Sequence, residues 1–159
     1  MSAAVYGIGN ILMGDDGIGP AVARFLADRW TFDDDVVIED LGTPSLDLPG
    51  YLIGHDLVVL VDAVASDGQP GALRIYRGDE IVAVPPGIRI SPHEPSVNDA
   101  LAVLAFADKT PADVVLVGVV PETLDGGVQL SPAVADAVTA AADAVVHELA
   151  DHGHKAIRK

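Results

Sequence analysis

An apolar stretch that runs directly into a glycine-rich turn constrains the fold of this chain more than any other feature. Residues 3–8 read as a buried strand, residues 7–19 read G-I-G-N-I-L-M-G-D-D-G-I-G, and residues 19–30 carry apolar side chains at helical spacing. A strand, a tight turn and an amphipathic helix in this order are typical of α/β proteins with a parallel sheet. In such folds the functional site lies beyond the carboxyl ends of the strands.

The glycine-rich turn does not match a dinucleotide-binding loop. The G-x-G-x-x-G fingerprint of such loops requires a third glycine at the position that Leu12 occupies. Asp15 and Asp16 stand where a phosphate would meet the helix N-terminus, and two carboxylates would repel it. The turn therefore suits a cation or a partner that carries a metal, and a nucleotide-binding enzyme is disfavoured.

The rest of the chain continues the alternation of strands and helices. We expect further strands at residues 35–41, 57–61, 72–76 and 114–120, and helices at residues 45–53 (with Ser45 as a candidate cap), 96–106 and 132–149. The run at 57–61 is uninterruptedly apolar, which is typical of a central parallel strand. The predicted fold class is α/β, a three-layer sandwich with a mainly parallel twisted sheet flanked by helices, in a single domain over residues 1–159.

The end of the chain, about residues 150–159, is expected to be a frayed and solvated tail. Three of the nine basic residues lie there. Histidines close to it could bind a metal, but a frayed helix end is the preferred explanation for them (His147, His152 and His154).

Composition and charge exclude several classes of function. The 159 residues include 24 acidic and 9 basic side chains, and the formal net charge of −15 would repel nucleic acid and anionic lipid. The chain contains no cysteine, which rules out disulfides, thiolate zinc sites and a cysteine nucleophile. No apolar run approaches the ~20 residues of a membrane span, and no basic region precedes the first apolar run. We therefore expect a cytoplasmic protein with neither nucleic-acid nor membrane partners.

Three side chains that can hold a metal each follow a predicted strand or turn. Asp16 lies in the glycine-rich turn, Asp62 directly follows the strand at 57–61, and His93 follows residues 88–92. Because the carboxyl ends of parallel strands share one edge of the sheet, all three should fall on that edge. Two carboxylate oxygens and one imidazole nitrogen suit zinc, nickel or iron, with coordination positions left open for another ligand.

Each of these residues also has a simple structural interpretation. Asp16 could cap the following helix, Asp62 could form an Asx turn, and His93 could support a Ser-Pro-His-Glu turn. Other hydrolytic sites fit less well, because the chain has no G-x-S-x-G nucleophile motif. Asp15 and Asp16 are adjacent, so their side chains diverge and cannot form a paired-aspartate protease site.

Five segments, taken together, resemble the hydrogenase maturation proteases. These endopeptidases trim the C-terminal extension from the large-subunit precursor of [NiFe] hydrogenases. Beside the turn at 7–19, the segments are D-L-G-T at 40–43, V-V-L-V-D-A at 58–63, I-S-P-H at 90–93 and V-G-V-V-P-E-T at 117–123. The resemblance covers nearly the whole chain. It implies an endopeptidase that acts on a [NiFe] hydrogenase large-subunit precursor.

The resemblance also implies which residues meet the metal. The family's acid in the glycine-rich turn, aspartate at the end of the third strand and histidine after Ser-Pro match Asp16, Asp62 and His93. These three residues would be both the catalytic and the metal-contacting ones. The nickel would be supplied by the substrate, whose own cysteines hold it, so no permanent metal is required. The metal could polarise the carbonyl, or water could be activated by the metal or by a carboxylate, with Asp16 or Asp62 as the base.

The family's D-G-G-T stretch, which is implicated in choosing the correct substrate, is matched here by D-L-G-T. Asp40, Gly42 and Thr43 are therefore implied to bind substrate, whereas Leu41 departs from the commoner glycine. We interpret Leu41 as the mark of a subgroup that serves a different hydrogenase class. We expect a monomer. The alternative function is a non-catalytic binding module that senses nickel or acts as a chaperone for a metalloprotein, and it would use the same three metal-contacting residues.

Overall fold

The computed structural model describes residues 2–83 and 97–159. Its main sheet has five strands in the order β3-β1-β4-β6-β5. Four of these strands are parallel, and β5 pairs antiparallel with β6 at one edge. The strands are β1 (Ala3–Ile8), β3 (Val36–Gly42), β4 (Leu57–Ala63), β5 (Leu73–Arg77) and β6 (Asp113–Val119). The predicted mainly parallel sheet is confirmed, and the strand expected at residues 72–76 is β5, at one side of it.

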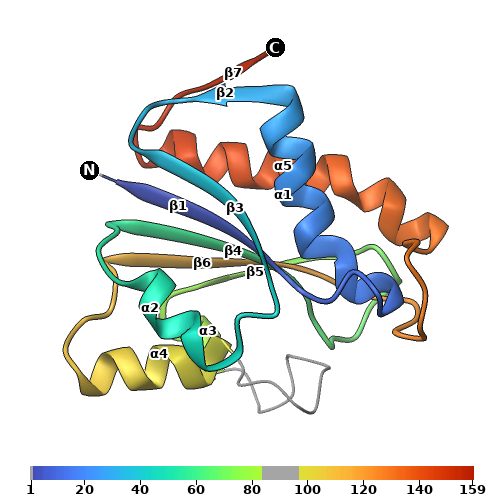
Figure 1. Cartoon of the computed structure of the whole chain (residues 1–159), viewed down its shortest axis with the longest axis horizontal. Coiled ribbons are helices and arrows are strands. Elements are labelled where there is room, and N and C mark those ends of the chain that lie inside the picture. Colours follow the sequence, from blue (N-terminus) through green and yellow to red (C-terminus); the bar gives the residue numbers. More distant parts are fainter. Residues whose placement is uncertain (1, 84–96) are drawn as a thin grey trace.

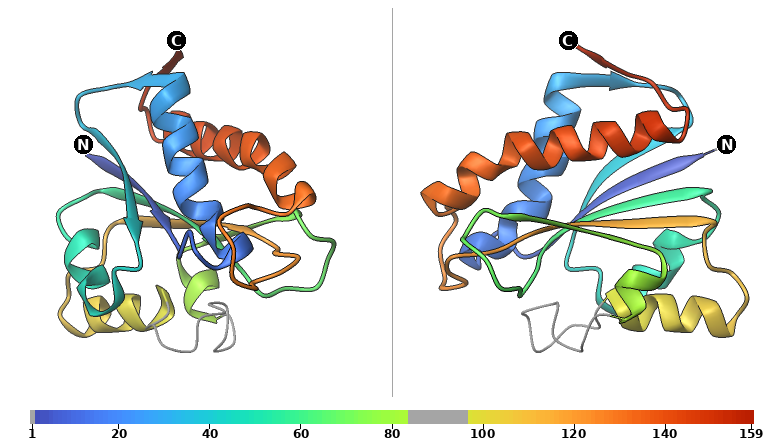
Figure 2. Two further views of the ribbon diagram at one scale, coloured as in Figure 1. Left: turned by 45° about the vertical axis from the view of Figure 1, so that its right-hand side comes forward. Right: turned by 180° about the vertical axis from the view of Figure 1, so that it is seen from behind.

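Helices cover both faces of the sheet, so the predicted three-layer sandwich is also confirmed (Figures 1 and 2). One face carries α1 (Ile18–Arg29) and α5 (Pro132–Asp151). The other face carries α2 (Leu48–Leu52), α3 (Asp79–Ala83) and α4 (Val97–Phe106). None of the helices in the described ranges is long and apolar enough to span a membrane.

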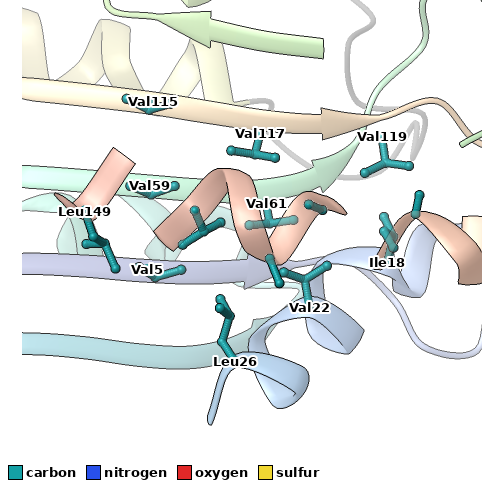
Figure 3. Close-up of a cluster of buried hydrophobic side chains, with 14 of the residues drawn as sticks. Val5, Ile18, Val22, Leu26, Val59, Val61, Val115, Val117, Val119 and Leu149 are labelled. Atoms are coloured by element: carbon teal, nitrogen blue, oxygen red, sulfur yellow. The ribbon is translucent and has the colours of Figure 1, made fainter. Parts of the chain in front are cut away.

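The alternation of side chains along the central strand β4 divides the core into two parts. Val59 and Val61 belong to the cluster under α1 and α5, whereas Val58 and Leu60 belong to the cluster under α2 and α4. Figure 3 shows the first cluster, with valines of three parallel strands facing α1 and α5. Because both faces of β4 are buried, its sequence is continuously apolar until Asp62.

The helix expected at residues 45–53 divides into two short pieces. A 3-10 turn at Ser45–Asp47 leads into α2. Ser45 does not cap either piece, so that prediction was wrong: its backbone has a φ of 54°, and no side-chain capping bond forms at either start. A cap residue normally has an extended backbone conformation, whereas the backbone of Ser45 is left-handed.

The chain end is not a frayed tail, and that prediction was also wrong. Residues Ala156–Arg158 form strand β7, which pairs antiparallel with β2 (Trp30–Phe32) directly after α1. The backbone N–H of Lys159 then donates to the carbonyl of Arg29 at 2.9 Å. The guanidinium of Arg158 lies 5.2 Å from the centre of the Trp30 ring. These contacts fix the end of the chain near the starts of the parallel strands, which are called the amino edge of the main sheet below (Figure 1). The ends of the same strands are called the carboxyl edge.

Candidate active site

The glycine-rich turn folds back so that its two ends touch. Gly9 has a φ of 145°, and a Cβ atom there would lie 1.8 Å from the carbonyl oxygen of Asp16. Only glycine fits such an approach, which explains the second glycine of the motif. At the start of α1, a Cβ on Gly19 would lie 2.3 Å from the carbonyl oxygen of Ile8 and 2.4 Å from that of Val61. The turn and the helix therefore press directly on the carboxyl ends of β1 and β4.

The carboxylate of Asp16 is held in this turn by a backbone N–H and does not cap α1. It lies in the 3-10 turn η1 (Gly14–Gly17) and is 7% exposed. The backbone N–H of Asn10 donates to its Oδ2 at 2.8 Å, and the N-cap of α1 is Gly17, without a side-chain bond. Among residues 2–83 and 97–159, the other oxygen, Oδ1, accepts no hydrogen bond. Asp16 thus has one oxygen engaged by the chain and one that a ligand can use.

Asp15, its neighbour, points the other way and is wholly buried. Its carboxylate accepts hydrogen bonds from the backbone of Glu122 (2.8 Å) and Thr123 (3.1 Å), and from both the backbone (2.7 Å) and hydroxyl (2.8 Å) of Ser131. Burial alone would raise the pKa of Asp15, but these four donors together hold that pKa below its ordinary value. Asp15 is therefore a structural anchor that ties the turn to residues 122–131.

Sequence reasoning paired the two aspartates as one acidic feature and missed this division of roles. The partners of Asp15 lie 107 to 116 residues further along the chain. No pattern among neighbouring residues predicts a contact over such a distance in the sequence. The sequence did indicate that the two adjacent side chains diverge, but not what surrounds each carboxylate.

Asp62 lies inside β4, as the sixth of its seven residues, and not just after the strand. It is 1% exposed, and its Oδ1 accepts a hydrogen bond from the backbone N–H of Ala63 at 2.9 Å. A position within a paired strand, opposite Gly118 of β6, rules out the turn that the alternative interpretation assumed. By alternation, Asp62 shares the face of Val58 and Leu60.

The structure brings the surroundings of Asp16 and Asp62 together. The turn η1 contacts β4, and the approach of Gly19 to Val61 joins the start of α1 to the same strand end. His93 lies outside the described residues, so its place beside the two aspartates stays a prediction. By sequence it belongs to the segment between α3 and α4, and both helices cover the sheet face that Asp62 shares.

The D-L-G-T stretch borders the glycine-rich turn. The pairing of β1 with β3 shifts at this point, with Gly7 opposite Asp40 and Ile8 opposite Gly42, so Leu41 is an extra residue in a β-bulge. The N–H of Gly9 donates to the carbonyl of Gly42 at 2.8 Å. Leu41 packs against the core cluster under α2 and α4.

A pocket of about 180 Å³ opens between these two segments. The residues that line it are Gly9, Asn10, Ile11, Asp40, Gly42 and Thr43. Asp40 accepts a hydrogen bond from the N–H of Gly42 at 2.9 Å and pairs with Arg24 of α1 at 3.3 Å. The three residues implied to bind substrate therefore do line one hollow, beside the turn that carries Asp16.

The C-terminal histidines each pair with a different acid and do not belong to this site. His147 pairs with Asp151 at 3.4 Å and His152 with Asp113 at 3.5 Å, while His154 is buried beside Asp35 at 3.5 Å. Ligand atoms of Asp33, Asp35 and His154 lie within 4.8 Å of one another. Because Asp35 precedes β3, this group is at the opposite edge of the sheet from Asp16.

Comparisons with known proteins agree with the geometry. A family model described as hydrogenase maturation protease matches residues 20–148. The chain is similar to the hydrogenase 2 maturation protease of Escherichia coli strain K12, with 35% identity over 158 residues that cover 99% of this chain and 96% of the relative.

Solved structures give the same picture. The hydrogenase maturating endopeptidase HybD from E. coli superposes with a TM-score of 0.92 at 34% identity, covering 100% of this chain and 98% of that one. The [NiFe] hydrogenase maturation protease HybD from Thermococcus kodakarensis superposes with a TM-score of 0.73 at 30% identity, covering 94% and 99% of the two chains. The likeness therefore extends over the whole fold, including the edge at which the parallel strands end.

Proposed function

This chain belongs to the hydrogenase maturation protease family, and we propose that it removes the C-terminal extension of a [NiFe] hydrogenase large-subunit precursor that already carries nickel. The observation that carries the proposal is the pair of buried carboxylates, Asp16 and Asp62, at the carboxyl edge of the sheet. The side chain of Asp16 does not cap α1, and Asp62 lies within a strand and not in a turn. Buried acids without such a role are candidates for chemistry.

In the proposed mechanism, Asp16, Asp62 and His93 engage the nickel of the precursor, and the enzyme holds no permanent metal. The open Oδ1 of Asp16 supports this assignment, because Asn10 orients the carboxylate through its other oxygen. Three protein ligands of the O, O, N type leave room in the coordination sphere for the ligands of the precursor. The metal would then fix the scissile bond beside the two carboxylates, so that proximity contributes much of the rate.

The bond itself is cut by water in this proposal. One aspartate accepts a proton as the water oxygen attacks the scissile carbonyl carbon, and the amide C–N bond breaks. The leaving nitrogen takes up a proton, so the products are a new carboxylate on the precursor and a free amine on the released peptide. We assign substrate recognition to Asp40, Gly42 and Thr43, whose shared pocket supports a role in holding the peptide next to Asp16.

The test is the intact mass of the natural precursor after incubation with the protein, with and without nickel loaded. We expect loss of a C-terminal peptide only from the nickel-loaded precursor. Asp62→Asn should lower the cleavage rate by at least about 100-fold, because it removes a charge that contacts the metal. Asp67→Asn is the matched control, since Asp67 is an exposed acid that follows the same strand. Circular dichroism verifies that both variants are folded.

His93→Ala extends the same experiment to the residue that lies outside the described ranges. We expect it to abolish processing and to leave the fold intact. Normal processing by both Asp62→Asn and His93→Ala would overturn the site assignment. A stable, nickel-dependent complex with no change in precursor mass would instead favour the binding module. A monomeric enzyme and action in the cytoplasm stay predictions from the sequence.

A further inference from the structure

We propose that four exposed apolar side chains form a docking surface for an apolar segment of the precursor next to the bond that is cut. These residues, Ile11, Leu12, Met13 and Val128, are called the apolar ridge below. The inference rests on the proposed function, because it identifies what kind of peptide the same site accepts.

The apolar ridge is exposed although its residues are large and apolar. Leu12 is 60% exposed and Val128 is 75% exposed, while Ile11 and Met13 are 43% and 42% exposed. Residues 2–14 carry no charged side chain at all, in a chain whose net charge is −15. Clustered exposed apolar side chains rimmed by polar residues mark interaction sites.

Backbone contacts hold the two halves of the apolar ridge together before any partner arrives. Met13 and Gly127 form an isolated parallel bridge, in which Gly14 N–H donates to the Gly127 carbonyl at 3.0 Å and Gly127 N–H donates to the Leu12 carbonyl at 2.9 Å. Figure 2 shows the two segments, blue and orange, beside each other. The buried carboxylate of Asp15 anchors the same two segments. A surface fixed in this way binds without a large ordering cost.

The apolar ridge is continuous with the proposed active site. Ile11 lines the pocket that contains Asp40 and Thr43, and it follows Asn10, whose N–H binds Asp16. On its other side, Ile11 and Val128 line a second hollow of about 220 Å³, together with Leu130. An apolar side chain that enters this hollow would place its own backbone along the turn that carries Asp16.

Charge favours the precursor over a second copy of this chain as the occupant. Exposed Glu122 and Asp125 precede Val128 in the same segment, and two copies that each carry −15 would repel one another. Four side chains are also too few for a stable dimer, which needs roughly 20–30 residues a side. The partner segment is therefore apolar, and its flanks are neutral or basic.

Steady-state cleavage of the nickel-loaded precursor tests the proposal with Leu12→Ser and Val128→Ser. Each variant should raise KM about fivefold or more and leave kcat within about twofold, because the contact is made equally in the ground and transition states. Ile157→Ser is the matched control, since Ile157 is 67% exposed on β7 at the opposite edge of the sheet. It should change neither constant.

Two additional measurements keep the result unambiguous. The melting temperature identifies any variant that fails to fold, and binding of the precursor to the inactive Asp62→Asn protein should weaken when Leu12→Ser is added. Unchanged KM and binding in the serine variants, with cleavage by the natural protein intact, would overturn this inference alone. Failure of the natural protein to cleave would overturn the proposed function. A dimer in light scattering that Leu12→Ser dissolves would assign the apolar ridge to a second copy and would also overturn the inference.

Discussion

The two edges of the parallel sheet are both closed by contacts between distant segments, but in opposite ways. At the amino edge, β7 pairs with β2, and the Trp30 ring under Arg158 is only 7% exposed. At the carboxyl edge, the carboxylates of Asp15 and Asp16 are buried, while the apolar side chains around them are exposed. The first arrangement covers apolar surface and stabilises the fold. The second arrangement buries charged groups and exposes apolar side chains. This is the pattern of a surface that a partner covers.

Of the changes at the two edges, Asp15→Asn is expected to have the largest effect on stability. An amide places an NH2 group among four donors that now bind a carboxylate, so at least one of them loses its acceptor. We expect a loss of roughly 2–4 kcal/mol in the free energy of unfolding at pH 7, since hydrogen bonds to buried charges are the costly ones to break. Urea unfolding measures it. Asp125→Asn, an exposed acid in the segment that Asp15 anchors, is the control and should stay within about 0.5 kcal/mol.

The same anchor predicts how stability depends on pH. The pKa of Asp15 is lower in the folded protein than in the unfolded chain, where it is about 3.9. Its stabilising contribution is therefore complete above pH 3.9 and is lost as the pH falls through the lower, folded pKa. The Asp15→Asn protein should lack this part of the acid transition. An identical acid limb in both proteins would mean that the carboxylate is not the anchor.

A smaller effect is expected when the amino edge is opened by deletion of residues 156–159. The deletion removes the pairing of β7 with β2 and the contact of Arg158 with Trp30. We expect a loss of about 2 kcal/mol, which for a chain of this size lowers the melting temperature by roughly 4–8 °C. Cleavage at 25 °C should be unchanged, because the site is at the other edge. Arg158→Ala alone should give less than half of the shift, and a loss of cleavage without a change in melting temperature would refute the separation of the two edges.

The smallest effect is expected from Arg24→Gln, which breaks the ion pair with Asp40 at the rim of the substrate pocket. The side chain of Arg24 is 61% exposed and that of Asp40 is 29% exposed. Solvent screens such a pair, so stability should change by less than about 0.5 kcal/mol. If the pair orients Asp40 for substrate, KM should rise by about two- to threefold with kcat unchanged. A change in kcat would show that Arg24 belongs to the chemistry and not to the pocket.

The parts of the fold that the sequence predicted are those whose signal is local. The apolar run at residues 57–61 has no polar interruption, and it identified a central strand that the structure extends to Ala63. The ends of that strand and of β1 placed Asp16 and Asp62 at one edge, because parallel strands leave no other choice.

The parts that the sequence did not predict depend on contacts between distant residues. Strands β2 and β7 have three residues each, too few for an alternating pattern, and each forms only because the other is present. The role of Asp15 requires Ser131, 116 residues later, and nothing near either residue indicates it. Serine is a residue type that often caps helices, but the left-handed backbone of Ser45 prevents that role.

The hydrogen bonds of Asp15 to distant residues also determine when the site can form during synthesis. Its partners on residues 122–131 are made after all of the sheet strands that flank the turn. A nascent chain that ends before Ser131 can form β1, β4 and β6, but its turn lacks the donors that fix the acidic pair. The proposed site therefore stays incomplete during synthesis until Ser131 has been added, which is directly before α5 begins at Pro132.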